Sequence, residues 1–156
     1  MAQRKTGVVR IATTQVLTWV LLPPAFTAFH AQWPETRVEP IDIPTDQILH
    51  ARDNGQADLA INFDQPVGEH LEALDLFDMR EHLICAGYVK PISRVHDLRA
   101  IPLVEPDMLH RFMLYRNRSR SITPAVQEHQ KFLLEYFGRT RGRPVEDVMV
   151  PRWAPR

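Results

Sequence analysis

The chain has 156 residues, of which 44% are hydrophobic and 24% charged; this is ordinary for a globular domain and excludes a wholly disordered protein. A single cysteine, Cys85, excludes an internal disulfide framework. The 19 basic and 19 acidic residues give a formal net charge of zero, so the chain as a whole does not attract nucleic acid. The length predicts one domain, with a disordered N-terminus over 1–6 and a flexible Arg- and Pro-rich tail over 138–156.

The most apolar segment runs from Val16 to Phe29 and follows two basic residues, as a signal peptide would. A polar run separates it from those basic residues, Pro23 and Pro24 interrupt it, and no small-residue cleavage site follows. The segment is also too short to span a membrane. We therefore expect a cytoplasmic protein without a membrane partner.

A buried strand and a long helix open the predicted fold. The β-branched run at 7–12 is typical of a buried strand. Apolar residues then recur at helical spacing as far as Trp33, and Pro23 is expected to kink or restart this helix. Because the apolar residues cover more than one stripe, we expect Trp19 or Phe29 on the outer side.

A second strand and a short helix follow. The alternating segment 37–43 predicts a strand, and Pro40 places it at a sheet edge because proline cannot donate a ladder hydrogen bond. A helix is expected over 45–54, with Thr45 as its N-cap. Gly55 is well placed for the left-handed residue that ends many helices.

Residues 57–62 predict a third strand, so strands and helices alternate with short connections. This order predicts an α/β fold with a parallel-type sheet and helices on both faces. A last helix is expected to begin after the N-cap Thr123 and to end near Phe137. The shorter predictions are strands at 74–77, 82–86, 101–104 and 112–115, and a helical turn at 95–98.

Small polar residues follow each of the first three strands. In parallel sheets, ligands bind beyond the carboxyl ends of the strands. The candidate ligand contacts are therefore Thr13, Thr14, Gln15, Thr45 and Asn62. Their hydroxyl and amide groups suit an anion, but no Gly-rich phosphate loop accompanies them. The alternative is that Thr14 and Thr45 only cap helices.

Three stretches of the sequence form a recognisable pattern: Gly7–Thr14 with Leu21–Pro24, Phe26-x-x-Phe29 and Trp33-Pro34; Gly55-Gln-Ala-Asp58-Leu-Ala-Ile61; and Met113–Val126 through Leu133. Together they resemble the effector-binding domain of LysR-type transcriptional regulators. The resemblance implies a periplasmic-binding-protein-like (type 2) fold that senses a small molecule, commonly anionic or aromatic, through the turns after its first two strands.

The sequence also departs from the family pattern. The family's helix-turn-helix has no counterpart, so we expect no specific DNA binding by this chain alone. The segment 97–104 leads almost directly into 112–116, where the family has a second subdomain. We therefore expect a single effector-binding subdomain over 7–137, with the junction near 102–110. Because the opposite wall of the cleft is then missing, effector affinity should be weak.

Two functions of different class stay open, with a third behind them. The first is a ligand-sensing regulatory domain. The second is an interaction module that forms a homodimer through the first helix and the edge strand, since the family's effector domains pair through these surfaces. The third is a solute-binding protein. No catalytic triad or carboxylate pair indicates an enzyme, His82 and Cys85 lack further metal ligands, and no cofactor is expected.

Overall fold

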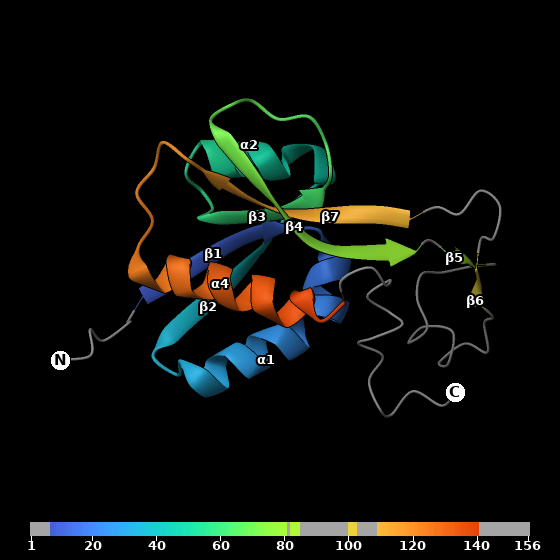
Figure 1. The fold of residues 1–156 in the computed structure, drawn as a ribbon, viewed down its shortest axis with the longest axis horizontal. Coiled ribbons are helices and arrows are strands. Elements are labelled where there is room, and N and C mark those ends of the chain that lie inside the picture. The colour runs from blue at the N-terminus through green and yellow to red at the C-terminus, as the bar shows by residue number, and fades with distance from the viewer. Residues whose placement is uncertain (1–6, 81, 85–99, 103–108, 141–156) are drawn as a thin grey trace.

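A computed structural model describes residues 7–80, 82–84, 100–102 and 109–140. Within them, a five-stranded sheet of order β2-β1-β3-β7-β4 carries helices on both faces, and β5 and β6 form a separate pair (Figure 1). The strands are β1 (Gly7–Thr13), β2 (Thr36–Asp42), β3 (Leu59–Phe63), β4 (Leu71–Arg80), β5 (His82–Ile84), β6 (Ala100–Pro102) and β7 (Leu109–Asn117). The helices are α1 (Leu22–Gln32), α2 (Ile48–Asp53) and α4 (Pro124–Gly138). The predicted α/β class is confirmed.

The strands β1, β2 and β3 form the parallel part of the sheet. Strand β1 lies in the middle, with Val9 beside Val38 of β2 and Ile11 beside Leu59 of β3. Strand β2 lies at the edge, as Pro40 predicts, since its outer side needs no ladder partner. The alternation of strands and helices therefore predicts this half of the sheet correctly.

The other half of the sheet is antiparallel. Strand β7 follows β4 by about thirty residues in the sequence, yet it lies between β3 and β4 and is antiparallel to both. The pairing of β4 with β7 shifts register between Asp75 and Phe77, which marks a β-bulge. The sheet is thus mixed, and the predicted parallel arrangement holds for its first three strands only.

The first helix restarts at its prolines, as predicted. A π-helical turn spans Leu17–Leu21, and α1 then begins with proline in its first turn. Trp19 is 68% exposed, which confirms one of the two outward positions expected. Phe29 is fully buried, so Trp19 is the one of the two that takes the expected outward position.

The second helix begins differently from its prediction. A 3₁₀ turn, Thr45–Gln47, precedes α2, and the residue before that turn is Pro44. Gln47 occupies the N-cap position of α2, and no side chain caps either element. The prediction of Thr45 as an N-cap is therefore wrong, because the added turn places it inside the first helical residues. Gly55 has a φ of +82°, which confirms its left-handed conformation.

The last helix begins as predicted. The Oγ1 atom of Thr123 accepts a hydrogen bond from the backbone N–H of Val126 at 3.3 Å. Helix α4 ends at Gly138, and the buried Thr140 donates its hydroxyl to the carbonyl of Phe137 at 2.7 Å. The predictions for 1–6, 95–98 and 141–156 lie outside the described residues, as does most of the junction near 102–110.

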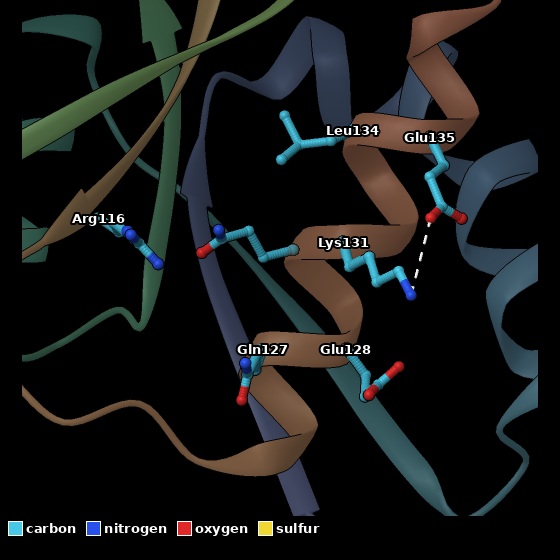
Figure 2. A pocket seen from close by; sticks show the side chains of 7 residues that line it. Arg116, Gln127, Glu128, Lys131, Leu134 and Glu135 are labelled. Carbon is cyan, nitrogen blue, oxygen red and sulfur yellow. Dashed lines mark ion pairs between the residues drawn. The ribbon is translucent and has the colours of Figure 1, made fainter.

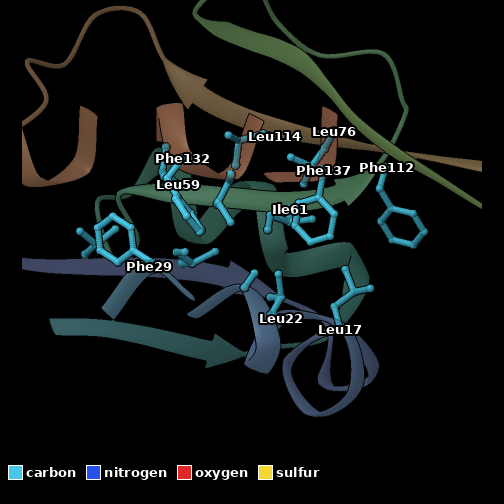
Figure 3. Close-up of a cluster of buried hydrophobic side chains, with 14 of the residues drawn as sticks. Leu17, Leu22, Phe29, Leu59, Ile61, Leu76, Phe112, Leu114, Phe132 and Phe137 are labelled. Carbon is cyan, nitrogen blue, oxygen red and sulfur yellow. The ribbon is translucent and has the colours of Figure 1, made fainter. Parts of the chain in front are cut away.

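Two apolar clusters lie on opposite faces of the sheet. The larger one fills the space between the sheet and the helices α1 and α4, and it includes Phe29, Phe132 and Phe137 (Figure 3). The smaller one lies under α2 and consists of Ala12, Ile48, Ala51, Ala57, Ala60, Met113 and Tyr115. In the described residues, no helix combines the length and apolar character needed to cross a bilayer.

Candidate functional site

The carboxyl ends of the three parallel strands meet at one edge of the sheet. Strand β1 ends at Thr13, and the carbonyl of Thr13 accepts a hydrogen bond from the N–H of Ile43, just beyond β2, at 3.3 Å. Asn62 lies near the end of β3. This arrangement brings the backbone of the predicted site residues to a common edge, which we call the strand-end edge.

Asn62 links the end of β3 to the turn before α2. Its side chain is fully buried, and its Nδ2 donates to the carbonyl of Thr45 at 3.0 Å. Its Oδ1 accepts from the N–H of Phe63 at 2.9 Å. Both ends of the amide are thus used inside the protein. The side chain positions the turn that presents Thr45, and any contact it makes with a ligand comes in addition to that task.

Thr13 has a buried hydroxyl without a hydrogen-bond partner among the described residues. By strand alternation its side chain lies on the same face as Val9 and Ile11, toward α1 and α4. Asn62 alternates with Ile61 and lies on the face covered by α2. The structure therefore brings these two residues to the same edge, but it directs their side chains to opposite faces.

The other predicted contacts are more open. Thr14 is half-buried, and its carbonyl accepts from the N–H of Thr18 at 3.1 Å at the start of the helix. Gln15 and Thr45 are exposed. No side chain caps the 3₁₀ turn or α2, so the helix-capping alternative has no support at Thr45. Thr14 directly precedes the first helical residue, Gln15, which is the position of an N-cap.

Tyr115 completes the strand-end edge, and sequence reasoning missed it. Its hydroxyl donates to the carbonyl of Phe63 at 2.7 Å and accepts from the N–H of Gln65 at 3.2 Å. Burial raises the pKa of its phenol above the usual value, so it stays a neutral donor at physiological pH. Tyr115 comes from β7, and only knowledge that β7 pairs with β3 could have revealed its role.

The described residues contain no group of three or more His, Cys, Asp or Glu placed to hold a metal ion. The side chains of His82 and Cys85, which share a spacing that could begin a metal site, lie outside the described part of the chain. The strand-end edge instead offers hydroxyls, amides and backbone groups. Such groups can bind a small polar molecule by hydrogen bonds.

Solved structures of similar fold include domains of transcriptional regulators. The effector-binding domain of QuiR in complex with shikimate has a TM-score of 0.74 at 12% identity, over 86% of this chain and 98% of that one. The cofactor-binding domain of the Cbl transcriptional regulator has a TM-score of 0.71 at 17% identity, over 95% and 94%. At such identities the likeness concerns the fold, and it confirms the predicted periplasmic-binding-protein-like (type 2) architecture.

A third similar structure is a putative LysR family transcriptional regulator from Pseudomonas aeruginosa, with a TM-score of 0.70 at 11% identity over 88% of this chain and 77% of that one. No curated protein matches the sequence. The sequence profile described as the LysR substrate binding domain matches residues 2–87, which is more than half of the chain and includes the whole strand-end edge contributed by β1, β2 and β3. The chain therefore belongs to the LysR substrate binding domain family.

Proposed function

We propose that this regulatory domain senses a small anionic or aromatic metabolite at the strand-end edge. The observation that carries the proposal is the position there of two threonines, the half-buried Thr14 and the exposed Thr45, the second held by the hydrogen bond from Asn62 to its carbonyl. In a family of substrate-binding domains, such groups are suited to bind a ligand's oxygen atoms. The QuiR effector binding domain, which has a similar fold, was solved in complex with the small molecule shikimate.

Each predicted residue has a distinct part in this proposal. Thr14 and Thr45 donate hydroxyl hydrogen bonds to the ligand, and Gln15 adds an exposed amide beside them. Asn62 holds the backbone of Thr45 in place through its 3.0 Å hydrogen bond. Thr13 lies at the same edge with a buried hydroxyl on the opposite face of the sheet, where only a ligand group that enters from the α1 side could reach it.

We also propose that the domain binds its ligand weakly. We propose that residues 7–137 are one subdomain of the two that form a complete cleft, with a shortened junction near 102–110. The pairing of β7 with both β3 and β4 supports this, because the returning strand closes the sheet by itself. A single wall leaves most of a ligand in water, so dissociation constants near ~1 mM, or about −4 kcal/mol, are expected.

Calorimetric and NMR titration with a panel of small carboxylates tests the site. Thr14→Ala and Thr45→Ala should each weaken the binding of whichever ligand is found by about three- to tenfold, the loss of one hydrogen bond. Thr27→Ala is the matched control, because this exposed threonine of α1 bonds only to the carbonyl of Pro23, at 3.0 Å. Micromolar binding that neither substitution at the edge affects would refute the assignment.

We further propose that the domain forms a homodimer through the first helix and the edge strand β2. Trp19 is 68% exposed, and Val16 and Val20 are 38% and 43% exposed on the same helical stretch. An apolar surface of this kind beside a sheet edge favours contact with a second copy. The closed two-fold pair is the commonest arrangement for such copies.

Sedimentation at tens of micromolar tests this pairing. Trp19→Glu should convert the dimer to monomer, because it places a charge in the centre of the contact. Leu109→Glu is the matched control, since Leu109 is 46% exposed and lies on β7, away from the first helix and β2. A monomer before any substitution, or equal effects of the two substitutions, would contradict the proposed interface.

A further inference from the structure

A second pocket lies away from the strand-end edge, between β7 and α4 (Figure 2). Its volume of about 540 Å³ is within the range of small-molecule sites. Arg116 of β7 forms one side, and Gln127, Gln130 and Leu134 of α4 belong to the other. In Figure 2, Gln127 and Leu134 extend from the side of α4 that faces Arg116.

Gln130 is the unusual residue of this pocket. Its side chain is 9% exposed, and its Oε1 is buried without a hydrogen-bond donor among the described residues. Buried amide oxygens in proteins are almost always satisfied. The unsatisfied Oε1 of Gln130 in the lining of this pocket therefore indicates a hydrogen-bond donor supplied from outside the described part of the protein, such as a ligand hydroxyl.

Arg116 supplies the positive charge. Its Nε donates to Oε2 of Glu72, the residue opposite it on β4. This bond uses the Nε side of the guanidinium, and neither amino nitrogen has a hydrogen-bond partner in the part of the chain that the structure describes. Arginine held in this way has a fixed orientation, and its amino nitrogens suit the two oxygens of a carboxylate.

The other charges of the pocket lie apart from Arg116. Lys131 and Glu135 pair with each other, with Nζ and Oε1 3.9 Å apart, on the side of α4 that faces away from Arg116 (Figure 2). Glu128 also extends to that side. Glu72 is the acidic group nearest to the guanidinium, and its charge is balanced by the ion pair. A ligand anion thus approaches the amino edge of Arg116 and meets Gln127, Gln130 and Leu134 opposite.

We propose that this pocket is a second ligand site, specific for a small carboxylic acid that also carries a hydroxyl group. The carboxylate binds the amino nitrogens of Arg116, the hydroxyl donates to Oε1 of Gln130, and an apolar part of the ligand packs on Leu134. The Gln127 amide is placed to donate a further hydrogen bond to the carboxylate.

This site is independent of the sensing site proposed above. Arg116 follows Tyr115, which pairs with Ala60, whereas Met113 pairs with Asn62 at the strand-end edge. Arg116 is therefore three residues from the edge position on β7, about 10 Å along the strand. It also lies on the α4 face of the sheet, while Asn62 lies on the α2 face. The two sites can consequently be tested, and can fail, separately.

The experiment is an NMR titration of the whole chain with mandelate, phenylacetate and mandelamide. Mandelate has the carboxylate, hydroxyl and apolar group; phenylacetate lacks the hydroxyl, and mandelamide lacks the charge. We expect mandelate to shift the side-chain signals of Gln127, Gln130 and Arg116 with a dissociation constant in the millimolar range. Phenylacetate should bind about threefold more weakly, and mandelamide about tenfold more weakly.

Substitutions identify the site. Arg116→Gln should weaken mandelate about tenfold, whereas Arg118→Gln, which removes an equal charge from an exposed neighbour, should have no effect. Gln130→Leu should reduce mandelate affinity to that of phenylacetate and leave phenylacetate unchanged. If Arg116→Gln destabilises the fold by leaving Glu72 unpaired, the double variant Glu72→Gln/Arg116→Gln replaces it.

Three results would overturn the proposal. The first is the absence of shifts at the pocket residues at about 20 mM mandelate, a concentration well above the expected constant. The second is equal loss of affinity in Arg116→Gln and Arg118→Gln. The third is that mandelate shifts only the signals of Thr14 and Thr45, which would assign the binding to the strand-end edge.

Discussion

The two faces of the sheet are held together by different interactions. Between the sheet and the helices α1 and α4, aromatic rings pack on one another: Phe29 lies 4.8 Å from Trp33 and 5.3 Å from Phe132, measured between ring centroids. Under α2 the buried residues are mostly alanines, and polar groups fasten the helix instead. Asn62 bonds the turn before α2. Arg52 donates to the carbonyl of Ala57 at 3.4 Å.

Polar contacts also fasten the end of α2. Arg120 donates to the carbonyl of Asp53 at 3.0 Å, and His70 pairs with the Asp53 carboxylate at 3.2 Å. Apolar burial scales with area, so the aromatic face supplies most of the stability. Moving α2 on the polar face should therefore cost less free energy than moving α1 or α4, and Thr45 lies in the turn that precedes α2. Helix α2 is therefore attached by polar contacts to the aromatic half, which is the more rigid of the two.

The largest expected effect is at the centre of the aromatic face. Phe29→Ala should lower the free energy of unfolding by about 3–5 kcal/mol, because it removes a fully buried ring and leaves a cavity among aromatic neighbours. Ile48→Ala, at an equally buried position under α2, should cost less, about 2–3 kcal/mol. Urea unfolding measures both values. A larger loss for Ile48→Ala would contradict the division between the two faces.

The second effect is a pH dependence that belongs to the aromatic face. His129 is fully buried. The centroid of its ring lies 4.2 Å from that of Phe29 and 5.8 Å from that of Phe26. Neither ring nitrogen has a hydrogen-bond partner among the described residues. Burial lowers its pKa from 6.5 to about 4. The neutral ring is therefore favoured in the folded state, and the unfolded state takes up a proton first as the pH falls.

The stability due to neutral His129 is complete above pH 6.5 and is lost progressively as the pH falls toward 4. We expect a loss of about 3 kcal/mol between pH 7 and pH 4 from this residue. Unfolding of His129→Leu over the same range should lack that component. His70→Gln, on the polar face where His70 is half exposed, should retain it. Identical pH profiles for the wild type and His129→Leu would contradict the prediction.

The parallel half of the fold was predictable because its signals are local. Alternation and proline place β1, β2 and β3, and the strand-end rule then gathers Thr14, Thr45 and Asn62. The antiparallel half depends on contacts between distant segments, which no short pattern encodes. Tyr115 was missed for this reason. The π-helical turn was missed because one extra residue in a turn leaves the apolar spacing almost unchanged.

The third effect distinguishes a positioning residue from a merely stabilising one. Asn62→Ala should cost about 1–3 kcal/mol, because it removes the buried side-chain hydrogen bonds to the carbonyl of Thr45 and from the N–H of Phe63. It should also weaken ligand binding at the strand-end edge. Asn117→Ala is the control, since Asn117 is 8% exposed and accepts from the N–H of Ser119 at 2.8 Å, at the far end of β7.

Hydrogen exchange and ligand titration measure the two parts of that prediction. In Asn62→Ala, the amides of the 45–48 turn should exchange faster, since the tether to β3 is gone. In Asn117→Ala, exchange there and ligand affinity should both stay unchanged. If the two substitutions weaken the ligand equally, the tether does not position the site.

The smallest effect compares two threonines that look alike in the sequence. Each precedes a predicted helix, but only Thr123 accepts a hydrogen bond from its helix, at 3.3 Å from the N–H of Val126. Thr123→Ala should therefore cost about 1 kcal/mol, and Thr45→Ala less than about 0.5 kcal/mol, because Thr45 caps neither the 3₁₀ turn nor α2. Thermal unfolding resolves this difference. Since the Thr45 hydroxyl contributes little to folding, a loss of ligand affinity in Thr45→Ala without a loss of stability would identify it as a group reserved for binding. Equal destabilisation by both substitutions would mean that Thr45 is a cap after all and that the polar face offers one hydroxyl fewer to the ligand.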